Sequence, residues 1–301
     1  MSSKSSPADR SLKLAPTDRW LRLPDGRRLW VRMWPGEGTP LVLLHGLLDC
    51  GEGWDHLARS THRPCVAFDL PGFGRSDLPT RPRISAYAED VLTGLEQLAL
   101  RRYVLVGHSL GGAVAAAVAE RTPDETAGLA LLAPAGFGRI RLAETVTVPG
   151  VREVAARVLP WALSSSIALT VAYAAFVANG ERPDEAMLVR TKARAFEAAP
   201  GARDATRAVV AAGLSQNAFH RRRVAFRGPV EALWGERDRV VPRSHADGVR
   251  IAFPQARVEV WPAMGHHPQR ERAPQLHDFI ERACADRRDA TVGIRPLRTA
   301  A

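Results

Sequence analysis

The sequence predicts an α/β fold in which a doubly wound, mostly parallel sheet of about eight strands carries an inserted helical cap. Short apolar runs rich in β-branched residues alternate with longer segments of helical spacing, as in βαβ units. The chain has 301 residues and 46% hydrophobic content, which is enough to bury a large core. The interval from Gly136 to Arg227 is too long for one crossover connection and therefore indicates an insertion.

The elements can be justified in order along the chain. Residues 20–23 and 29–34 flank the turn Pro24-Asp25-Gly26, which predicts a hairpin at the edge of the sheet. A helix is expected from Ile84 to Leu98, because apolar residues recur there near helical spacing. Parallel strands are expected at residues 41–45, 65–69, 104–106, 129–133, 230–234 and 258–261.

The strand at 104–106 runs into Gly107-His108-Ser109-Leu110-Gly111, which continues as an alanine-rich helix. A serine between two glycines, at a strand-to-helix turn, is typical of a nucleophile held above the carboxyl edge of a sheet. Strand and helix crowd together at such a turn, so a Cβ at Gly107 or Gly111 would clash. Ser109 is therefore the candidate nucleophile, and an ordinary helix N-cap is the alternative interpretation.

Acyl transfer also needs two backbone N–H donors aimed at the developing oxyanion. Leu110, directly after Ser109 and in the first turn of the helix, would supply one of them. The other would come from the loop after the apolar strand that ends in His45-Gly46.

Two further strands end in loops that carry an acid and a base. Asp238 follows the strand at 230–234, and His266 follows the strand at 258–261. His266 would accept the proton of the serine, and Asp238 would hold the imidazole in the correct tautomer. Glu236 competes for the role of the acid, and His267 competes for that of the base.

Four stretches of the chain resemble the α/β-hydrolase fold superfamily, and the resemblance covers roughly residues 20–285. They are residues 69–76, 107–111, 235–242 and 265–268. Each resembles a stretch typical of the single-chain serine esterase, perhydrolase and C–C hydrolase branches, which carry a helical cap. The resemblance implies Leu47 as the second oxyanion donor and favours Asp238 and His266 over their rivals. A serine nucleophile argues against haloalkane dehalogenases and epoxide hydrolases of this fold, which use an aspartate.

These residues predict a serine hydrolase that acts on a small or medium apolar carboxylic ester, or a related acyl compound, through an acyl-enzyme on Ser109. C–C hydrolysis, perhydrolysis and acyl transfer would use the same triad. The C–C hydrolases tend to have Asn before the nucleophile and Trp after the catalytic histidine, where this chain has His108 and His267. The alternative of another class is a non-catalytic protein that binds a small ligand on the same scaffold.

The domain prediction places the core at residues 20–135 and 228–285 and the helical cap at 136–227. Residues 1–19 and 286–301 are expected to be tails. The uncharged run from Val158 to Gly180 has the length of a membrane span, but a span there would separate Ser109 from the acid and the base. Substrate-pocket residues are predicted from the core and from the cap: His45, His108, Phe137, Trp161 and Phe176.

Composition limits the partners. Only Lys4, Lys13 and Lys192 are lysines, so 39 of the 42 basic residues are arginine, spread along the chain. The net charge of +10 is therefore interpreted as compositional bias, and no nucleic-acid partner is expected. Membrane association is not expected either, and the chain should be a monomer or a homodimer. No cofactor or metal is expected, because no clustered Cys/His pattern is present in the sequence.

The cysteines bear on the compartment. Cys50, Cys65 and Cys284 are odd in number and widely spaced, unlike a disulfide framework. The polar, Ser-rich start from Met1 to Arg10 has no apolar segment for export. Both features predict a cytoplasmic protein.

Overall fold

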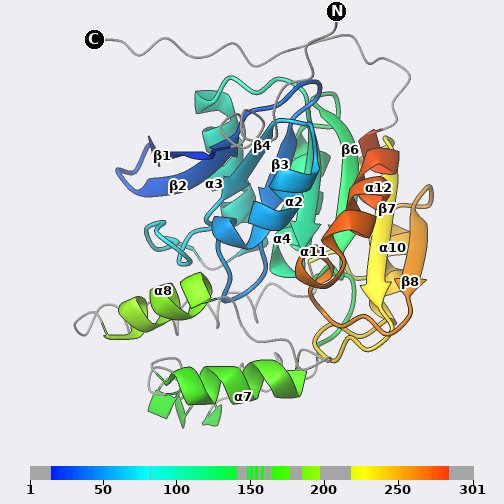
Figure 1. Ribbon diagram of the computed structural model, residues 1–301. Coiled ribbons are helices and arrows are strands. Elements are labelled where there is room, and N and C mark those ends of the chain that lie inside the picture. The colour runs from blue at the N-terminus through cyan, green and yellow to red at the C-terminus, as the bar shows by residue number, and fades with distance from the viewer. Residues whose placement is uncertain are drawn as a thin grey trace, which may run out of the picture.

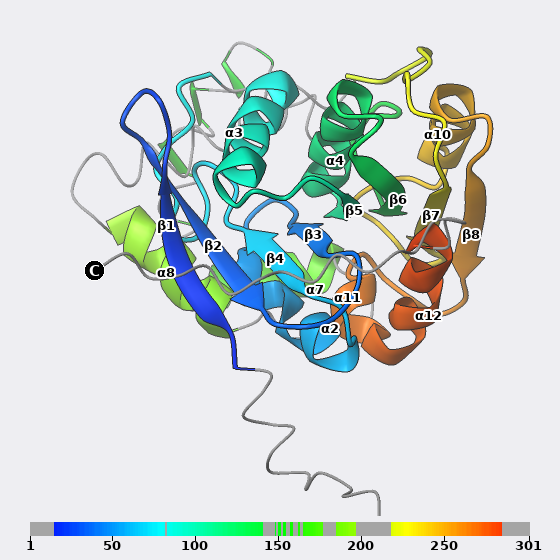
Figure 2. The same ribbon diagram turned by 90° about the horizontal axis from the view of Figure 1, so that it is seen from above.

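The computed structural model describes residues 15–81, 83–140, 165–176, 185–196 and 218–284, together with isolated positions between 148 and 162. Its centre is an eight-stranded sheet in the order β1-β2-β4-β3-β5-β6-β7-β8, with helices on both faces (Figures 1 and 2). The strands are β1 Thr17–Arg22, β2 Arg28–Trp34, β3 Leu41–Leu44, β4 Cys65–Phe68, β5 Tyr103–His108, β6 Thr126–Leu132, β7 Val230–Gly235 and β8 Arg257–Trp261. The prediction of a mostly parallel α/β sheet of about eight strands is confirmed.

Only the N-terminal edge of the sheet is antiparallel. β1 pairs with β2 and β2 pairs with β4 in antiparallel register, while β3, β4, β5, β6, β7 and β8 are joined by parallel pairs. The predicted hairpin is present, and Gly26 provides its turn with a φ of 86°. β1 begins at Thr17, three residues inside the segment expected as a tail, because Thr17 to Arg19 pair with Val31 to Met33.

The helices form two layers. α3 Ile84–Gln97, α4 Leu110–Arg121 and α10 His245–Ala252 cover one face, while η1 Gly51–Trp54, α2 Asp55–Ser60, α11 Pro268–Glu271 and α12 Ala273–Cys284 lie on the other (Figure 2). Each layer closes its own apolar cluster against the sheet, one around Tyr87, Val114 and Val249 and the other around Leu57 and Phe279. The sheet is therefore buried on both faces, as a parallel sheet requires.

Two further helices, α7 Ser166–Phe176 and α8 Glu185–Phe196, fall inside the interval predicted as the cap. They lie apart from the two layers, beyond the ends to which the arrowheads of β7 and β8 point (Figure 1). The carboxyl ends of parallel strands carry the ligand site in open α/β sheets, so these helices stand over the expected site. No helix of the described residues is long and apolar enough to cross a membrane.

Candidate active site

The three predicted catalytic residues come from the carboxyl ends of parallel strands. Ser109 follows β5 directly, Asp238 lies in the loop after β7, and His266 lies in the loop after β8. These strands belong to one parallel block of the sheet, so their exit loops meet at one edge.

The turn at Ser109 is strained. Its backbone has a φ of 52° and a ψ of −115°, a conformation that costs a non-glycine residue about 1–3 kcal/mol. Backbone bonds hold it there: the Ser109 N–H donates to Leu132 O at 2.9 Å, and its carbonyl accepts from Gly112 and Ala135. The sheet and α4 thus fix the position of the hydroxyl.

The two glycines that flank Ser109 are required by packing. A Cβ on Gly107 would lie 2.4 Å from the carbonyl oxygen of Gly111, and a Cβ on Gly111 would lie 2.1 Å from that of Leu44. Both distances are far inside van der Waals contact, as the sequence predicts for this turn. The glycines therefore let α4 start directly against β3 and β5.

Asp238 and His266 are joined by a hydrogen bond. Nδ1 of His266 lies 2.8 Å from Oδ2 of Asp238, and both side chains are almost completely buried. The other carboxylate oxygen accepts from the N–H groups of Val240 and Val241 at 2.8 and 3.0 Å. Because a carboxylate only accepts, His266 donates from Nδ1, which leaves Nε2 with a lone pair.

The rival acid and base make other contacts. Glu236 is exposed, and its carboxylate accepts from the N–H of Ala263 at 3.0 Å. His267 stacks on Tyr173 of α7 with ring centroids 5.2 Å apart. Of the two candidate pairs, the structure brings Asp238 and His266 together.

The residue before the serine contacts this pair. Ser109 follows His108, whose ring centroid is 4.7 Å from that of His266. Within the described part of the chain, the Ser109 hydroxyl makes no hydrogen bond, so the structure does not join it directly to His266. Nucleophile–base bonds are commonly long in a site without substrate and shorten when substrate binds.

Two backbone donors are available beside Ser109. Among the described residues, neither the N–H of Leu47 nor that of Leu110 donates to a carbonyl. Leu110 is the first residue of α4, so its N–H has no partner within the helix. Gly46 leaves room in front of Ser109, since a Cβ there would lie 3.1 Å from that of Ser109.

The two histidines expected in the pocket make buried hydrogen bonds to the backbone. The N–H of Leu70 donates to Nε2 of His45 at 2.9 Å, so Nδ1 of this ring carries the proton and donates to Gly46 O. His45 therefore has no free ring nitrogen and fixes the loop after β3. His108 donates from Nε2 to the carbonyl of His266 at 2.7 Å, and burial holds its pKa well below the usual value.

The aromatic pocket residues are distributed differently. Phe137 is buried in the core and stacks on Phe219, with ring centroids 5.2 Å apart. Trp161 and the side chain of Phe176 lie outside the described residues. Of the three predicted aromatic pocket residues, the structure therefore describes the side-chain surroundings of Phe137 alone.

A recess opens beside Leu48, between α8 and the loops that follow β3 and β4. It encloses roughly 360 Å³ including open solvent, and its apolar walls come from Leu48, Phe73 and Met187. Arg190 also lines it and is paired with Glu52. Leu48 adjoins Leu47, so the recess begins next to the candidate oxyanion donors.

The structure also brings together polar residues that the sequence analysis did not select. Arg270 of α11 donates to Asp49 at 2.6 Å and to the hydroxyl of Tyr173 at 3.2 Å. Asp49 also forms a buried group with His108 and His267. Asp49, Tyr173 and Arg270 belong to three distant segments, and no spacing in the sequence marks them as neighbours.

Comparison with known proteins identifies the fold family. The family model described as "alpha/beta hydrolase fold" matches residues 39–273. The chain is 33% identical over 258 residues to the dihydrolipoyllysine-residue acetyltransferase component of the acetoin cleaving system of Pseudomonas putida. That match covers 84% of this chain and 65% of the relative, so the chain spans less than two thirds of that protein.

A lipase and a solved structure are also similar. The bovine (lyso)-N-acylphosphatidylethanolamine lipase is 38% identical over 131 residues, which is 40% of this chain and 38% of that protein. The crystal structure of a bacterial membrane phospholipase A superposes with a TM-score of 0.71 and 25% identity, covering 93% of this chain and 90% of the other.

Proposed function

The chain belongs to the α/β-hydrolase fold family, and from this membership we propose that it is a serine hydrolase of small or medium apolar carboxylic esters. Ser109 is the proposed nucleophile, His266 the general base and Asp238 the acid that orients it. The observation that carries the proposal is the buried 2.8 Å hydrogen bond between Asp238 and His266, at the sheet edge where Ser109 occupies a strained turn.

The proposed mechanism follows from the tautomer of His266. With its Nδ1–H donated to Asp238, the lone pair on Nε2 accepts the proton of Ser109 as the hydroxyl oxygen attacks the ester carbonyl. The oxyanion of the tetrahedral intermediate accepts from the N–H groups of Leu47 and Leu110. Collapse of this intermediate expels the alcohol, which takes the proton from His266. Water then releases the acid through the same base.

The nature of the substrate is inferred from the recess beside Leu47. Its walls at Leu48, Phe73 and Met187 suit an acyl chain. Two charged residues also line it among the described residues, Arg190, which is paired with Glu52, and Asp49, which is paired with Arg270. We therefore expect short and medium acyl chains to be preferred over long or charged ones.

The decisive experiment is labelling with a fluorophosphonate probe, followed by measurement of the intact mass. The wild-type chain should gain one adduct and hydrolyse p-nitrophenyl esters, with turnover falling as the acyl chain lengthens. Ser109→Ala should lose the adduct and lose about 10⁴-fold or more in kcat. Ser60→Ala, at an exposed position at the end of α2, is the matched control and should behave as the wild type.

Two other outcomes would redirect the proposal. A folded wild-type chain without adduct or turnover would contradict it and would favour a non-catalytic ligand-binding protein. Acyl transfer is the second candidate, because the relative that matches over 84% of this chain is an acetyltransferase component. Adding a primary alcohol to the ester assay separates the two reactions, since a transferase would form the new ester in preference to the free acid.

A further inference from the structure

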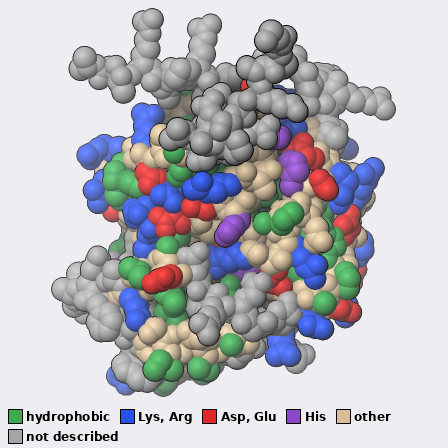
Figure 3. All heavy atoms as spheres, viewed as in Figure 1, with side chains coloured by type: hydrophobic (Ala, Val, Ile, Leu, Met, Phe, Trp, Pro, Cys, Tyr) green, Lys and Arg blue, Asp and Glu red, His purple; other side chains and the backbone are tan. Residues whose placement is uncertain are grey.

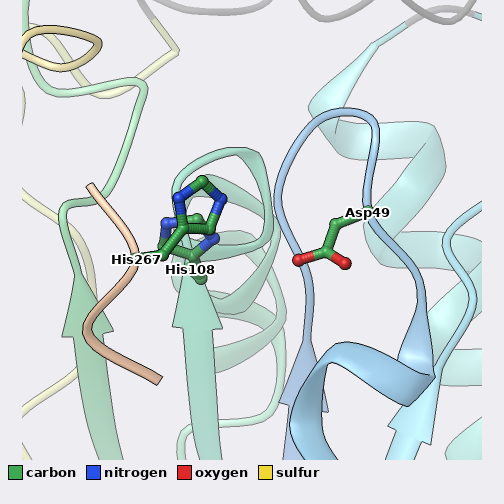
Figure 4. Close-up of side chains that lie close together, drawn as sticks. All are labelled: Asp49, His108 and His267. Atoms are coloured by element: carbon green, nitrogen blue, oxygen red, sulfur yellow. The ribbon is translucent and has the colours of Figure 1, made fainter. Parts of the chain in front are cut away.

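Three side chains close to the proposed triad, but outside it, gather into one buried cluster. Asp49 lies in the loop after β3, His108 ends β5 and His267 follows His266. All three are more than nine-tenths buried, and one ligand atom from each lies within 4.8 Å of those of the other two. Figure 4 shows the Asp49 carboxylate facing the two imidazoles.

Each member of the cluster has one buried polar atom without a hydrogen-bond partner in the described part of the chain. These atoms are Oδ2 of Asp49, Nδ1 of His108 and Nδ1 of His267. Each buried polar atom without a hydrogen-bond partner costs about 1–3 kcal/mol of folding free energy. Three such atoms at one place indicate that a bound group satisfies them. Because His108 donates its Nε2–H to the carbonyl of His266, its Nδ1 carries a lone pair.

Neighbouring groups form hydrogen bonds to His108 and Asp49 of the kind that second-shell residues make to metal ligands. Metal-bound histidines usually donate their other N–H to a carbonyl or a carboxylate, which His108 does through its 2.7 Å bond to His266 O. The other oxygen of Asp49, Oδ1, accepts from Arg270 at 2.6 Å and from the N–H of Cys50 at 2.9 Å. These bonds orient the carboxylate and leave Oδ2 free.

We propose that Asp49, His108 and His267 bind a divalent transition-metal ion, with Zn²⁺ as the representative case. Two imidazole nitrogens and one carboxylate oxygen form a ligand set that suits zinc, with a fourth position open to solvent or to a small ligand. The positive charge of Arg270 already balances the negative charge of Asp49. With a divalent ion bound, the site as a whole would be positively charged and would favour an anion in the fourth position.

The cluster needs only a modest contraction to bind such an ion. Ligand atoms about 2.0–2.1 Å from a tetrahedral metal lie about 3.3 Å from one another. The present spread of up to 4.8 Å must therefore close by about 1.5 Å at most when the ion binds.

The ion would sit next to the proposed nucleophile without using the proposed triad. A Cβ on Gly46 would meet both Nδ1 of His108, at 2.8 Å, and Cβ of Ser109, at 3.1 Å. The metal would thus join the loop after β3, the end of β5 and the loop after β8. The His266–Asp238 bond is outside its ligand set, so metal binding does not depend on the proposed hydrolysis.

Metal titration of the full chain tests the proposal. The wild type and Ser109→Ala are first treated with a chelator and dialysed. One sample of each protein is then titrated with Co²⁺ and another with Zn²⁺. Both proteins should bind one equivalent, give the visible absorption of tetrahedral Co²⁺, and melt at a higher temperature with Zn²⁺. Binding that persists in Ser109→Ala, even if no ester is hydrolysed, separates this inference from the proposed function.

Variants of the cluster assign the ligands. Asp49→Asn and His267→Phe should each bind Co²⁺ at least about ten-fold more weakly than the wild type. His267→Phe keeps an aromatic ring against Tyr173, so it provides the test if Asp49→Asn proves unstable. His277→Gln is the control, because His277 and Glu281 form a partly exposed pair on α12. Absence of stoichiometric binding, or binding lost in His277→Gln and kept in His267→Phe, would overturn the proposal.

Discussion

Two alanine-rich helices have opposite environments. The first ten residues of α4 are all buried, while Ile167 and Val171 of α7 are 77% and 62% exposed. α4 packs on the sheet beside α3 (Figure 2), and α7 lies beyond the carboxyl ends of the strands (Figure 1). Apolar composition therefore identifies a helix in this chain without identifying what the helix contacts.

The difference separates two tasks within one chain. α4 holds the serine turn against the sheet, where a single added carbon would collide with backbone. Among the described side chains of α7, Tyr173 reaches the site, where it stacks on His267 and accepts a hydrogen bond from Arg270. We therefore expect substitutions in α4 to act on folding and substitutions in α7 to act on what the site accepts.

The largest expected effect is that of Gly111→Ala at the start of α4. The new Cβ would lie 2.1 Å from the carbonyl oxygen of Leu44, and backbone cannot yield as a flexible side chain does. We expect a loss of about 3 kcal/mol or more in the free energy of unfolding, despite the higher helix propensity of alanine. Urea denaturation followed by circular dichroism measures it.

Ala174→Gly, at an exposed position of α7, is the paired substitution in the other helix. It should cost about 1 kcal/mol or less, the propensity difference alone. Equal losses in the two variants would mean that the contrast between the helices is wrong.

A smaller effect is expected from pH where the core meets the start of the predicted cap. His245 of α10 is buried against Gly138, with Nε2 3.4 Å from the carbonyl oxygen of Arg139, and burial lowers its pKa. Below the unfolded value of 6.5, the unfolded chain therefore binds a proton that the folded chain refuses. Stability should fall as the pH drops from about 6.5, by up to about 1.4 kcal/mol per pH unit.

His245→Asn isolates this contribution, because an amide can donate to the same carbonyl and does not titrate. Denaturation at several pH values should give a shallower loss below pH 6.5 for the variant than for the wild type. The difference should vanish near pH 8, where His245 is neutral in both states. Parallel curves over the whole range would show that His245 does not contribute.

The core could be predicted from sequence because its signals are local. β-Branched runs gave the strands, and the expected helix at residues 84–98 became α3 with an end shifted by one residue. The glycines on either side of Ser109 indicated that strand and helix lie close together at this turn. The short distances from a Cβ at Gly107 or Gly111 to neighbouring backbone confirm it. Loop positions after β7 and β8 pointed to the neighbourhood of the acid and the base, because parallel strands deliver their exit loops to one edge. The choice of Asp238 and His266 over Glu236 and His267 came from the resemblance to the family.

The pocket could not be predicted in the same way. His45 was expected among the pocket residues, and the hydrogen bond that its ring accepts from the Leu70 N–H lies outside any local pattern. Phe137 follows β6 closely, and only the tertiary packing with Phe219 and Phe253 explains its burial in the core. Asp49 and Arg270 are paired across 221 positions of sequence, a contact that residue type and spacing do not encode.

A third test concerns Tyr173, which connects α7 to the site in the described part of the chain. Tyr173→Phe removes the hydroxyl that accepts from Arg270 at 3.2 Å and keeps the ring on His267. We expect a loss of about 0.5–1.5 kcal/mol, the value of one hydrogen bond. Tyr173→Leu, which also loses the aromatic stack, should lose more; thermal melting of the two variants side by side measures the difference. A greater loss in Tyr173→Phe would show that the stacked ring contributes nothing.

The smallest effect on stability, and the sharpest test of the comparison, is expected from Ile167→Ser combined with Val171→Ser. Both side chains are largely exposed, so the double variant should unfold within about 0.5 kcal/mol of the wild type. If α7 acts on substrate, KM should rise for p-nitrophenyl esters with longer acyl chains and stay unchanged for the acetate. A loss of stability above about 1 kcal/mol would instead place the two side chains in a buried interface, as in α4. Unchanged stability with unchanged KM for every ester would leave α7 linked to the site through Tyr173 alone.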